Sequence, residues 1–414
     1  MDAMLTLAIL RASWNTIRHL STEQTLMTSK LILAAAMVVA SCATARGATP
    51  IAILNPGGLQ ANEYFGYSVA TDGQRVLIGT GTNTAFLYDP FTQQQLAKLS
   101  ILQGGFGTSV ALQGNTGVVG NGVGAFVFNF SNLANVTSIP LTSAGSPLTS
   151  IGYSVDVSGD VIIAGAAGDA TFGQFSGAAY LFDRITGASF SKLTANDAKQ
   201  NDNFGISVAI DDGRAAIGSV MGGPNNTGAV YLFNAEPGFA GNRQLDRYDQ
   251  PAPHSQTQFA YNADINAQTI VATEAFGQSY HWSIGGAPTL LPNSSFNNRV
   301  TADGISVSDD YIALGFEEQG LVRIYNKAGT LLRNLLPPPG SPIGFGLSVA
   351  IEGDLLVVGA GGGSPSASKT FVYRVQDVLV PEPSGFAVAC IGCSAVAFLR
   401  VGIGNLHSRR RQGF

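Results

Sequence analysis

Short runs of alternating apolar and polar residues, separated by tight-turn residues, fill most of this 414-residue chain. The pattern is clear between residues 204 and 245, where alternating runs at 204–210 and 215–217 flank the turn sequence 211–213. Alternation of period two predicts β-strands, and a short Asp/Gly interruption predicts a hairpin. An apolar run at 228–233 and a more polar run around 243–245 follow. The segment therefore predicts one four-stranded antiparallel unit.

This unit recurs along the chain. Windows related to Phe-Gly-x-Ser-Val-Ala begin at residues 65, 106, 151, 204, 259, 301 and 345, so successive starts lie 41 to 55 residues apart. Four strands of five or six residues plus turns need about 40 residues. A repeat of this length indicates one supersecondary unit stacked on itself, and small sheets packed around an axis form a β-propeller. We predict an all-β fold, a seven-bladed β-propeller of four-stranded antiparallel blades.

The sequence also predicts how the ring closes. Nothing resembling a fourth strand follows the seventh repeat, whereas a strand-like segment, residues 50–54, precedes the first one. We expect this N-terminal strand to complete the last blade and so remove an open sheet edge. The repeat Phe is expected to pack between adjacent blades, and the recurrent glycines are expected where backbones approach closely.

Composition narrows the possible functions. Glycine is abundant (51 residues), charged residues make up 12%, and the net charge is −5, which gives no basic surface for nucleic acid. The three cysteines, Cys42, Cys390 and Cys393, all lie near the ends. The repeat region therefore has no disulfide or thiolate metal site.

Few residues suggest chemistry. The Ser that recurs in five windows is interpreted as a structural hydrogen-bonding residue, because a single nucleophile would not recur in five copies; these residues are Ser68, Ser109, Ser154, Ser207 and Ser348. His254 and His281 have no metal-ligand spacing. The Gly-rich run at 361–365 lacks the Gly-Lys-Ser/Thr of a phosphate loop. We expect no catalytic residue, metal or other cofactor.

The N-terminal region, residues 1–48, is interpreted as an extension followed by a secretory signal peptide. Lys30 precedes an apolar run at 31–40, and small residues at 43–45 follow it, which is the order of a cleavable signal. Met27 is an alternative start. Cys42 also fits a lipoprotein-type cleavage site.

The C-terminal region, residues 379–414, has three parts in order. They are Val380-Pro381-Glu382-Pro383-Ser384, an apolar stretch at 385–399, and Arg409-Arg410-Arg411. This order resembles the PEP-CTERM sorting signal of bacterial exported proteins. The resemblance implies processing by an exosortase-type membrane enzyme and display at the cell surface or in an extracellular matrix. The apolar stretch is shorter than the roughly 20 residues of a spanning helix. A simple C-terminal membrane anchor is the alternative interpretation of the tail.

The repeats themselves resemble a known family. The residues that carry the signature are Phe65, Gly66, Phe106, Gly107, Gly152, Phe204, Gly205, Phe345 and Gly346. A repeat that begins Phe-Gly, continues Ser-Val-Ala and ends its second strand in Gly resembles the FG-GAP repeat of integrin α-subunits and secreted bacterial proteins. The resemblance spans residues 49–378 and implies a propeller that binds proteins or glycans through loops on one face. Many members carry calcium loops, but the corresponding turns here are too short for the roughly six to eight oxygen ligands that calcium takes.

The longest loops predict a binding surface. They span residues 169–177, 220–227 and 246–258, and the candidate contact residues are Asp169, Phe172, Asn225, Asn226 and Tyr248. These loops could equally be tolerated insertions. We expect a non-enzymatic exported propeller that binds an extracellular protein or glycan, with the membrane reached through the C-terminal helix. The alternative is a secreted polysaccharide lyase or hydrolase that acts at the propeller axis.

Overall fold

The computed structural model describes residues 48–380, except residues 61, 102–103, 144–145, 148–149, 252–257, 276, 293–303 and 362–366. The predicted signal peptide, the Pro-Glu-Pro motif with its apolar stretch and Arg cluster, and His254 lie outside these residues. Within the described part of the chain, no helix has the length and apolarity needed to span a bilayer.

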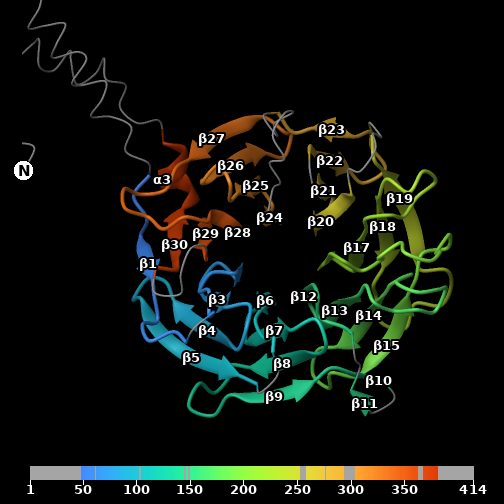
Figure 1. Cartoon of the computed structure of the whole chain (residues 1–414), viewed down its shortest axis with the longest axis horizontal. Helices are drawn as coiled ribbons and strands as arrows, with labels where there is room; N and C mark the ends of the chain where they lie inside the picture. Colours follow the sequence, from blue (N-terminus) through green and yellow to red (C-terminus); the bar gives the residue numbers. More distant parts are fainter. Residues whose placement is uncertain are drawn as a thin grey trace, which may run out of the picture. The chain divides into compact units, whose positions relative to one another are not determined.

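Seven four-stranded antiparallel sheets, here called blades 1 to 7, lie around a central axis and confirm the predicted propeller (Figure 1). The strands of blades 1 to 3 are β2 (Ser68–Thr71), β3 (Val76–Gly79), β4 (Thr84–Asp89) and β5 (Gln94–Ser100); β6 (Ser109–Gln113), β7 (Thr116–Gly120), β8 (Ala125–Asn129) and β9 (Thr137–Pro140); and β12 (Val155–Ser158), β13 (Val161–Ala166), β14 (Ala178–Asp183) and β15 (Ser189–Leu193).

The remaining blades repeat this order from the inner strand outward. Their strands are β16 (Val208–Asp211), β17 (Arg214–Ser219), β18 (Ala229–Asn234) and β19 (Gln244–Asp249); β20 (Phe259–Asn266), β21 (Thr269–Glu274), β22 (Ser279–Ser283) and β23 (Thr289–Leu290); β24 (Gly304–Val307), β25 (Tyr311–Phe316), β26 (Leu321–Asn326) and β27 (Leu331–Leu335); and β28 (Phe345–Glu352), β29 (Leu355–Ala360), β30 (Lys369–Arg374) and β1 (Ala52–Leu54).

The N-terminal strand closes the ring as predicted. β1 pairs antiparallel with β30, with Ala52 opposite Val372 and Leu54 opposite Thr370 (Figure 1). Ala52 and Leu54 are buried, whereas Ile53 between them is 44% exposed. One blade thus contains the two ends of the described ring, and β30 is not left as the outer edge of a three-stranded sheet.

Among the described residues, a short hairpin and a short helix lie outside the blades. β10 (Thr142–Ser143) and β11 (Ser146–Pro147) form a small hairpin in the connection from blade 2 to blade 3. The short helix α3 (Val375–Leu379) follows β30 and buries Val375 and Val378 in the apolar cluster shared by blades 6 and 7.

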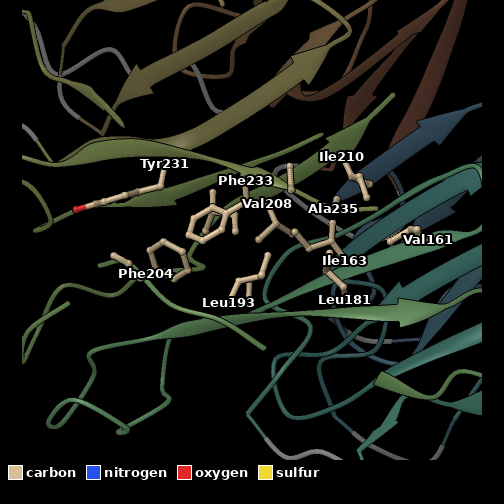
Figure 2. Packing of buried hydrophobic residues seen from close by; sticks show 14 of the residues in the cluster. Val161, Ile163, Leu181, Leu193, Phe204, Val208, Ile210, Tyr231, Phe233 and Ala235 are labelled. Carbon is tan, nitrogen blue, oxygen red and sulfur yellow. The ribbon is translucent and has the colours of Figure 1, made fainter. Parts of the chain in front are cut away.

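The repeat Phe packs between neighbouring blades, which confirms the predicted wedge. Phe204 is fully buried in a cluster that combines Leu181 and Leu193 of blade 3 with Val208 of blade 4 (Figure 2). Its ring makes edge-to-face contacts with the rings of Tyr231 and Phe233, whose centroids lie 5.4 and 5.8 Å away. Aromatic pairs of this geometry add about 1 kcal/mol to the free energy gained from burial.

Glycine is required where two blades meet backbone to backbone. A Cβ placed on Gly165 at the end of β13 would lie 2.0 Å from the carbonyl oxygen of Gly205 in blade 4. Gly205 itself has φ +88°, a conformation that side chains rarely adopt. The same close contact joins Gly359 of blade 7 to Gly66 of blade 1, so the closing junction is built like an internal one.

The repeat Ser joins adjacent blades by hydrogen bonds, in agreement with its structural interpretation. The Oγ atoms of Ser68, Ser207 and Ser348 donate to the carbonyl oxygens of residues 107, 260 and 66 at 2.8 to 3.1 Å. The Oγ of Ser154 accepts a hydrogen bond from the amide of Val208 at 3.0 Å. These side chains thereby satisfy backbone groups at the inner sheet edges, which have no further strand to pair with.

Candidate functional site

The antiparallel order of each blade determines which loops share a face of the ring. The connections between the second and third strands, and those between successive blades, all emerge on one face, called here the 2–3 face. The first-to-second and third-to-fourth turns emerge on the opposite face. The predicted loops 169–177 and 220–227 therefore lie on the same face, because each connects the second and third strands of its blade.

These two loops form one hydrogen-bonded surface with the connection between blades 3 and 4. Residues 169–177, 195–203 and 220–227 are called the loop platform. The amides of Asn201 and Asn203 donate hydrogen bonds to the carbonyl oxygens of Gln174 and Phe175, respectively, at 2.9 Å. The amide of Met221 donates to the carbonyl oxygen of Asp202 at 3.2 Å. Loops held in this way need little ordering when a ligand binds.

The loop platform exposes apolar side chains within a polar border. Phe172, Phe175 and Met221 are 51%, 47% and 37% exposed. Asn225 and Asn226 are exposed beside them, and the Oδ1 of Asn226 accepts a hydrogen bond from Lys199 Nζ at 2.8 Å. Exposed aromatic residues surrounded by polar groups are typical of an interaction surface.

Asp169, another predicted contact residue, anchors the first loop rather than standing free. Its carboxylate accepts hydrogen bonds from Lys192 Nζ at 2.7 Å and from the Thr171 hydroxyl at 2.6 Å. Partial burial raises the pKa of Asp169, but these hydrogen bonds outweigh that effect and hold the pKa below its ordinary value of 3.8. The residue stays ionised at neutral pH and stabilises the loop conformation.

Tyr248 lies elsewhere than predicted. The assigned loop 246–258 begins inside a strand, because residues up to Asp249 belong to β19, and residues 252–257 lie outside the described part of the chain. Tyr248 is only 6% exposed and packs on Trp282, while its hydroxyl accepts a hydrogen bond from the amide of Gly285. Polar neighbours in sequence concealed an aromatic side chain that packs between blades 4 and 5.

A second feature is a cavity of about 1220 Å³ on the axis of the ring. The inner strands of all seven blades line it. Three half-exposed tyrosines, Tyr67, Tyr153 and Tyr261, belong to this lining and follow the second repeat position in blades 1, 3 and 5. Sequence reasoning missed these residues, although their recurrence at one repeat position was a signal that could have revealed them.

Carboxylic acids also line the axial cavity, which the sequence did not suggest. Asp156 and Asp264 take the repeat position that is alanine in blades 1, 2, 4 and 7. Each accepts a hydrogen bond at 2.7 Å from an inner-strand amide of the next blade, Ile210 and Val307 respectively. Burial raises the pKa of Asp156 to about 8, assisted by the negative charge of Asp264, and burial raises that of Asp264 to about 7.

The structure assigns His281 to a packing position in β22. It is 6% exposed, and neither ring nitrogen has a hydrogen-bond partner among the described residues. Burial lowers its pKa, and the nearby positive charge of Lys327 lowers it further. Among the described residues, no group of three His, Cys, Asp or Glu side chains is placed to hold a metal ion.

Residues 145–182 and 188–233 match the family model described as FG-GAP repeat. Over these residues, the chain is similar to the FG-GAP repeat family. The matched segments contain most of blades 3 and 4 and the whole loop platform. Together with the ring of seven blades, they support an FG-GAP-type β-propeller. The search of curated proteins gave no match to the chain.

Solved structures share the architecture at low sequence identity. Raptor from Chaetomium thermophilum aligns with a TM-score of 0.54 and 12% identity over 80% of this chain, which spans only 29% of the Raptor chain. Hydrazine synthase from Kuenenia stuttgartiensis aligns with a TM-score of 0.54 and 12% identity over 78% of this chain and 98% of that one. At such identities, the similarity establishes the fold alone.

Proposed function

We propose that this protein is an exported, non-enzymatic binding propeller whose loop platform contacts an extracellular protein. The observation that carries the proposal is the group of exposed apolar side chains, Phe172, Phe175 and Met221, on loops fixed by backbone hydrogen bonds. A protein surface is favoured because large apolar side chains with a polar rim form the centres of protein–protein contacts.

Export is the second part of the proposal. The signal-peptide pattern and the resemblance of the C-terminal segment to a PEP-CTERM tail support it. In this proposal an exosortase-type enzyme processes the tail after its apolar stretch has engaged the membrane. Fractionation of cells that produce the tagged chain, with and without residues 381–414, tests this. Surface or matrix localisation that depends on the tail is expected, and retention of both forms in the cytoplasm would contradict export.

A paired substitution tests the loop platform. Replacing Phe172 and Phe175 by Ser removes the apolar centre but leaves the loop backbone bonds. Ile185→Ser is the matched control, because Ile185 is 73% exposed in the same blade but lies in a turn on the opposite face. The exported fraction of the producing organism is passed over each immobilised protein, and retained proteins are identified and titrated singly.

The expected result is one partner whose affinity falls by about tenfold or more in the double variant and is unchanged in the Ile185→Ser control. Equal retention by all three proteins would overturn the assignment of the platform.

One observation favours the alternative, an enzyme that acts on polysaccharide at the axis. Asp156 and Asp264 line the axial cavity with raised pKa values, and such carboxyls can act as general acids. Their hydrogen bonds to the next blade give both residues a structural task as well. Turnover of a polysaccharide that Asp156→Asn abolishes without lowering the melting temperature would establish the enzyme instead.

A further inference from the structure

We propose that the tyrosine-lined mouth of the axial cavity is a binding site for an uncharged saccharide chain. The site is separate from the loop platform, and nothing in the proposed protein contact requires it. Three features carry the inference: the placement of the tyrosines, their lack of other partners, and the charges deeper in the cavity.

The three tyrosines occupy equivalent places in alternate blades. Tyr67 and Tyr153 follow Gly66 and Gly152, both with φ +89°, and Tyr261 follows Ala260, also at positive φ. The inner strands run from the 2–3 face, so residues near the start of each inner strand, as these tyrosines are, lie at the mouth of the cavity on that face. The lining residues include all three tyrosines, which are 44%, 54% and 47% exposed.

These side chains have no structural task that explains them. Their hydroxyls make no hydrogen bond within the described residues, and their rings take no part in the aromatic pairs that fill the blade junctions. The repeat tolerates other residues at this position, since blade 2 has Thr108 and blade 4 has Ile206. Three exposed rings around one opening are therefore available to a ligand.

Nearby glycines bring loop backbone close to two of the rings. A Cβ added to Gly81 would lie 2.8 Å from Cγ of Tyr67, and one added to Gly122 would lie 3.8 Å from Cε2 of Tyr153. Loop backbone thus packs beside both rings and restricts their motion. Restricted aromatic rings lose little conformational entropy when a ligand packs on them.

A saccharide matches this combination of surfaces. The C–H faces of a sugar ring pack on aromatic faces, and its hydroxyls can pair with the tyrosine hydroxyls around the opening. The cavity volume of about 1220 Å³ leaves room for several sugar rings. A bound chain would cross the mouth and contact more than one blade.

The charges deeper in the cavity select against acidic sugars. Among the described residues, the acids in its lining are Asp72, Asp156, Asp211, Asp264, Asp309 and Glu352, and the one basic residue is Arg75, which pairs with Asp72. Burial keeps Asp156 largely protonated at neutral pH, so the remaining acids supply the negative charge. A cavity lined mainly by one sign of charge repels ligands of that sign. Uronates and sulfated sugars are therefore disfavoured.

The acids are not arranged to bind an ammonium group either. Asp72 pairs with Arg75 at 3.1 Å, and Asp156, Asp211 and Asp264 accept backbone amides of the next blade. Their carboxyl groups are already engaged in an ion pair or in hydrogen bonds within the wall of the cavity. This leaves the tyrosines as the ligand-facing groups and favours an uncharged chain.

Isothermal titration with four tetrasaccharides tests the proposal on the folded protein. Cellotetraose and the N-acetylglucosamine tetramer are uncharged, the galacturonate tetramer is anionic, and the glucosamine tetramer is cationic. We expect at least one uncharged tetramer to bind more tightly than either charged one. Tyr153→Ala should weaken that binding by about tenfold, whereas Tyr153→Phe, which keeps the ring, should weaken it less.

Two control variants separate this site from other surfaces. Phe91→Ala removes an aromatic residue that is 51% exposed in a turn on the opposite face, and it should not change the affinity. The Phe172/Phe175 double serine variant should bind the saccharide normally even if it loses its protein partner. The proposal is overturned if neither uncharged tetramer binds, if a charged tetramer binds more tightly, or if Tyr153→Ala binds as well as the unaltered protein.

Discussion

The junction between blades 3 and 4 and the junction between blades 5 and 6 solve the same packing problem differently. At the first, Gly165 lets the backbone of Gly205 approach, and Phe204 fills the space between the sheets. At the second, Thr273 takes the position of that glycine, and its buried hydroxyl has no partner among the described residues.

Blade 5, which lacks this glycine, has buried polar contacts instead. Glu274, at the end of β21, is 1% exposed and accepts hydrogen bonds from Nε2 of Gln250, in the connection from blade 4, at 2.6 Å and from the amide of Gln278, within blade 5, at 2.9 Å. Lys327 Nζ of blade 6 donates to Asn266 of blade 5 at 3.2 Å. The comparison teaches that the repeat signature serves close packing between blades. Where the signature is lost, polar contacts take the place of that packing.

The largest effect is expected at the closing junction, which resembles the first type. Leu54→Asp places a charge where the side chain is 1% exposed, whereas Ile53→Asp changes a neighbour that is 44% exposed. We expect Leu54→Asp to cost about 4 kcal/mol of unfolding free energy and Ile53→Asp about 0.5 kcal/mol or less. Deleting residues 49–55 should lower the melting temperature at least as much as Leu54→Asp. Urea unfolding measures all three, and equal stability would mean that β1 does not hold the ring.

The glycine position can be compared directly between the two junctions. Gly165→Val forces a Cβ to within 2.0 Å of a backbone oxygen, so we expect a loss of about 3 kcal/mol or more. Thr273→Val keeps the shape and removes the unpartnered hydroxyl, so its stability should stay within about 1 kcal/mol of the original, on the favourable side. Thermal melts measure both variants. Similar changes in melting temperature for the two would contradict this account of the two junctions.

The polar network can be disrupted at its central residue. Glu274→Ala leaves Gln250 Nε2 and the amide of Gln278 without this acceptor, and we expect a loss of about 2 kcal/mol. Glu274→Gln retains one acceptor oxygen and should lose less. Chemical denaturation in parallel with Gly165→Val would compare this polar network with the close backbone contact of the first junction. No loss in Glu274→Ala would remove the network from the explanation.

The last predictions concern pH, and two buried groups, Asp156 and His281, should affect stability in opposite directions. Asp156 at the first junction has a pKa of about 8 in the folded state against an ordinary 3.8, so the folded form retains its proton longer. Its contribution to stability falls as pH rises through that window. Asp264, at the second junction, shifts in the same direction.

His281 at the second junction has a pKa below its ordinary 6.5 in the folded state. The unfolded chain therefore binds its proton first, and stability falls as pH decreases below 6.5. We expect Asp156→Asn to flatten the decline of melting temperature above pH 4 and His281→Leu to flatten the decline on the acidic side. Unchanged pH profiles in both variants would show that neither group titrates as described.

Much of the fold could be predicted because it is encoded locally and repeated. Alternation in each segment gave the strands, and Phe-Gly gave the blade starts even in blade 5, where Ala260 replaces the glycine. The final unpaired third strand and the early strand at 50–54 together predicted the closure. Each inference needed only neighbouring residues and the count of repeats.

The candidate site was only partly predictable. Phe172 and Asn226 lie on the predicted face, but Tyr248 is buried in a strand, because its environment depends on Trp282 of the next blade. The tyrosine mouth was missed, since Tyr67 and Tyr261 are nearly 200 residues apart in sequence. Only closure of the ring brings them to one opening.

The sequence by itself determined the number of blades, their strand order and the strand that closes the ring, because these follow from short-range alternation and a repeated signature. Tertiary structure alone decided which polar and aromatic side chains share the axis. Every blade places its inner strand at the centre of the ring, so residues that are far apart in sequence become neighbours there. Their charges and exposed rings then form one shared surface, which cannot be deduced from any single repeat.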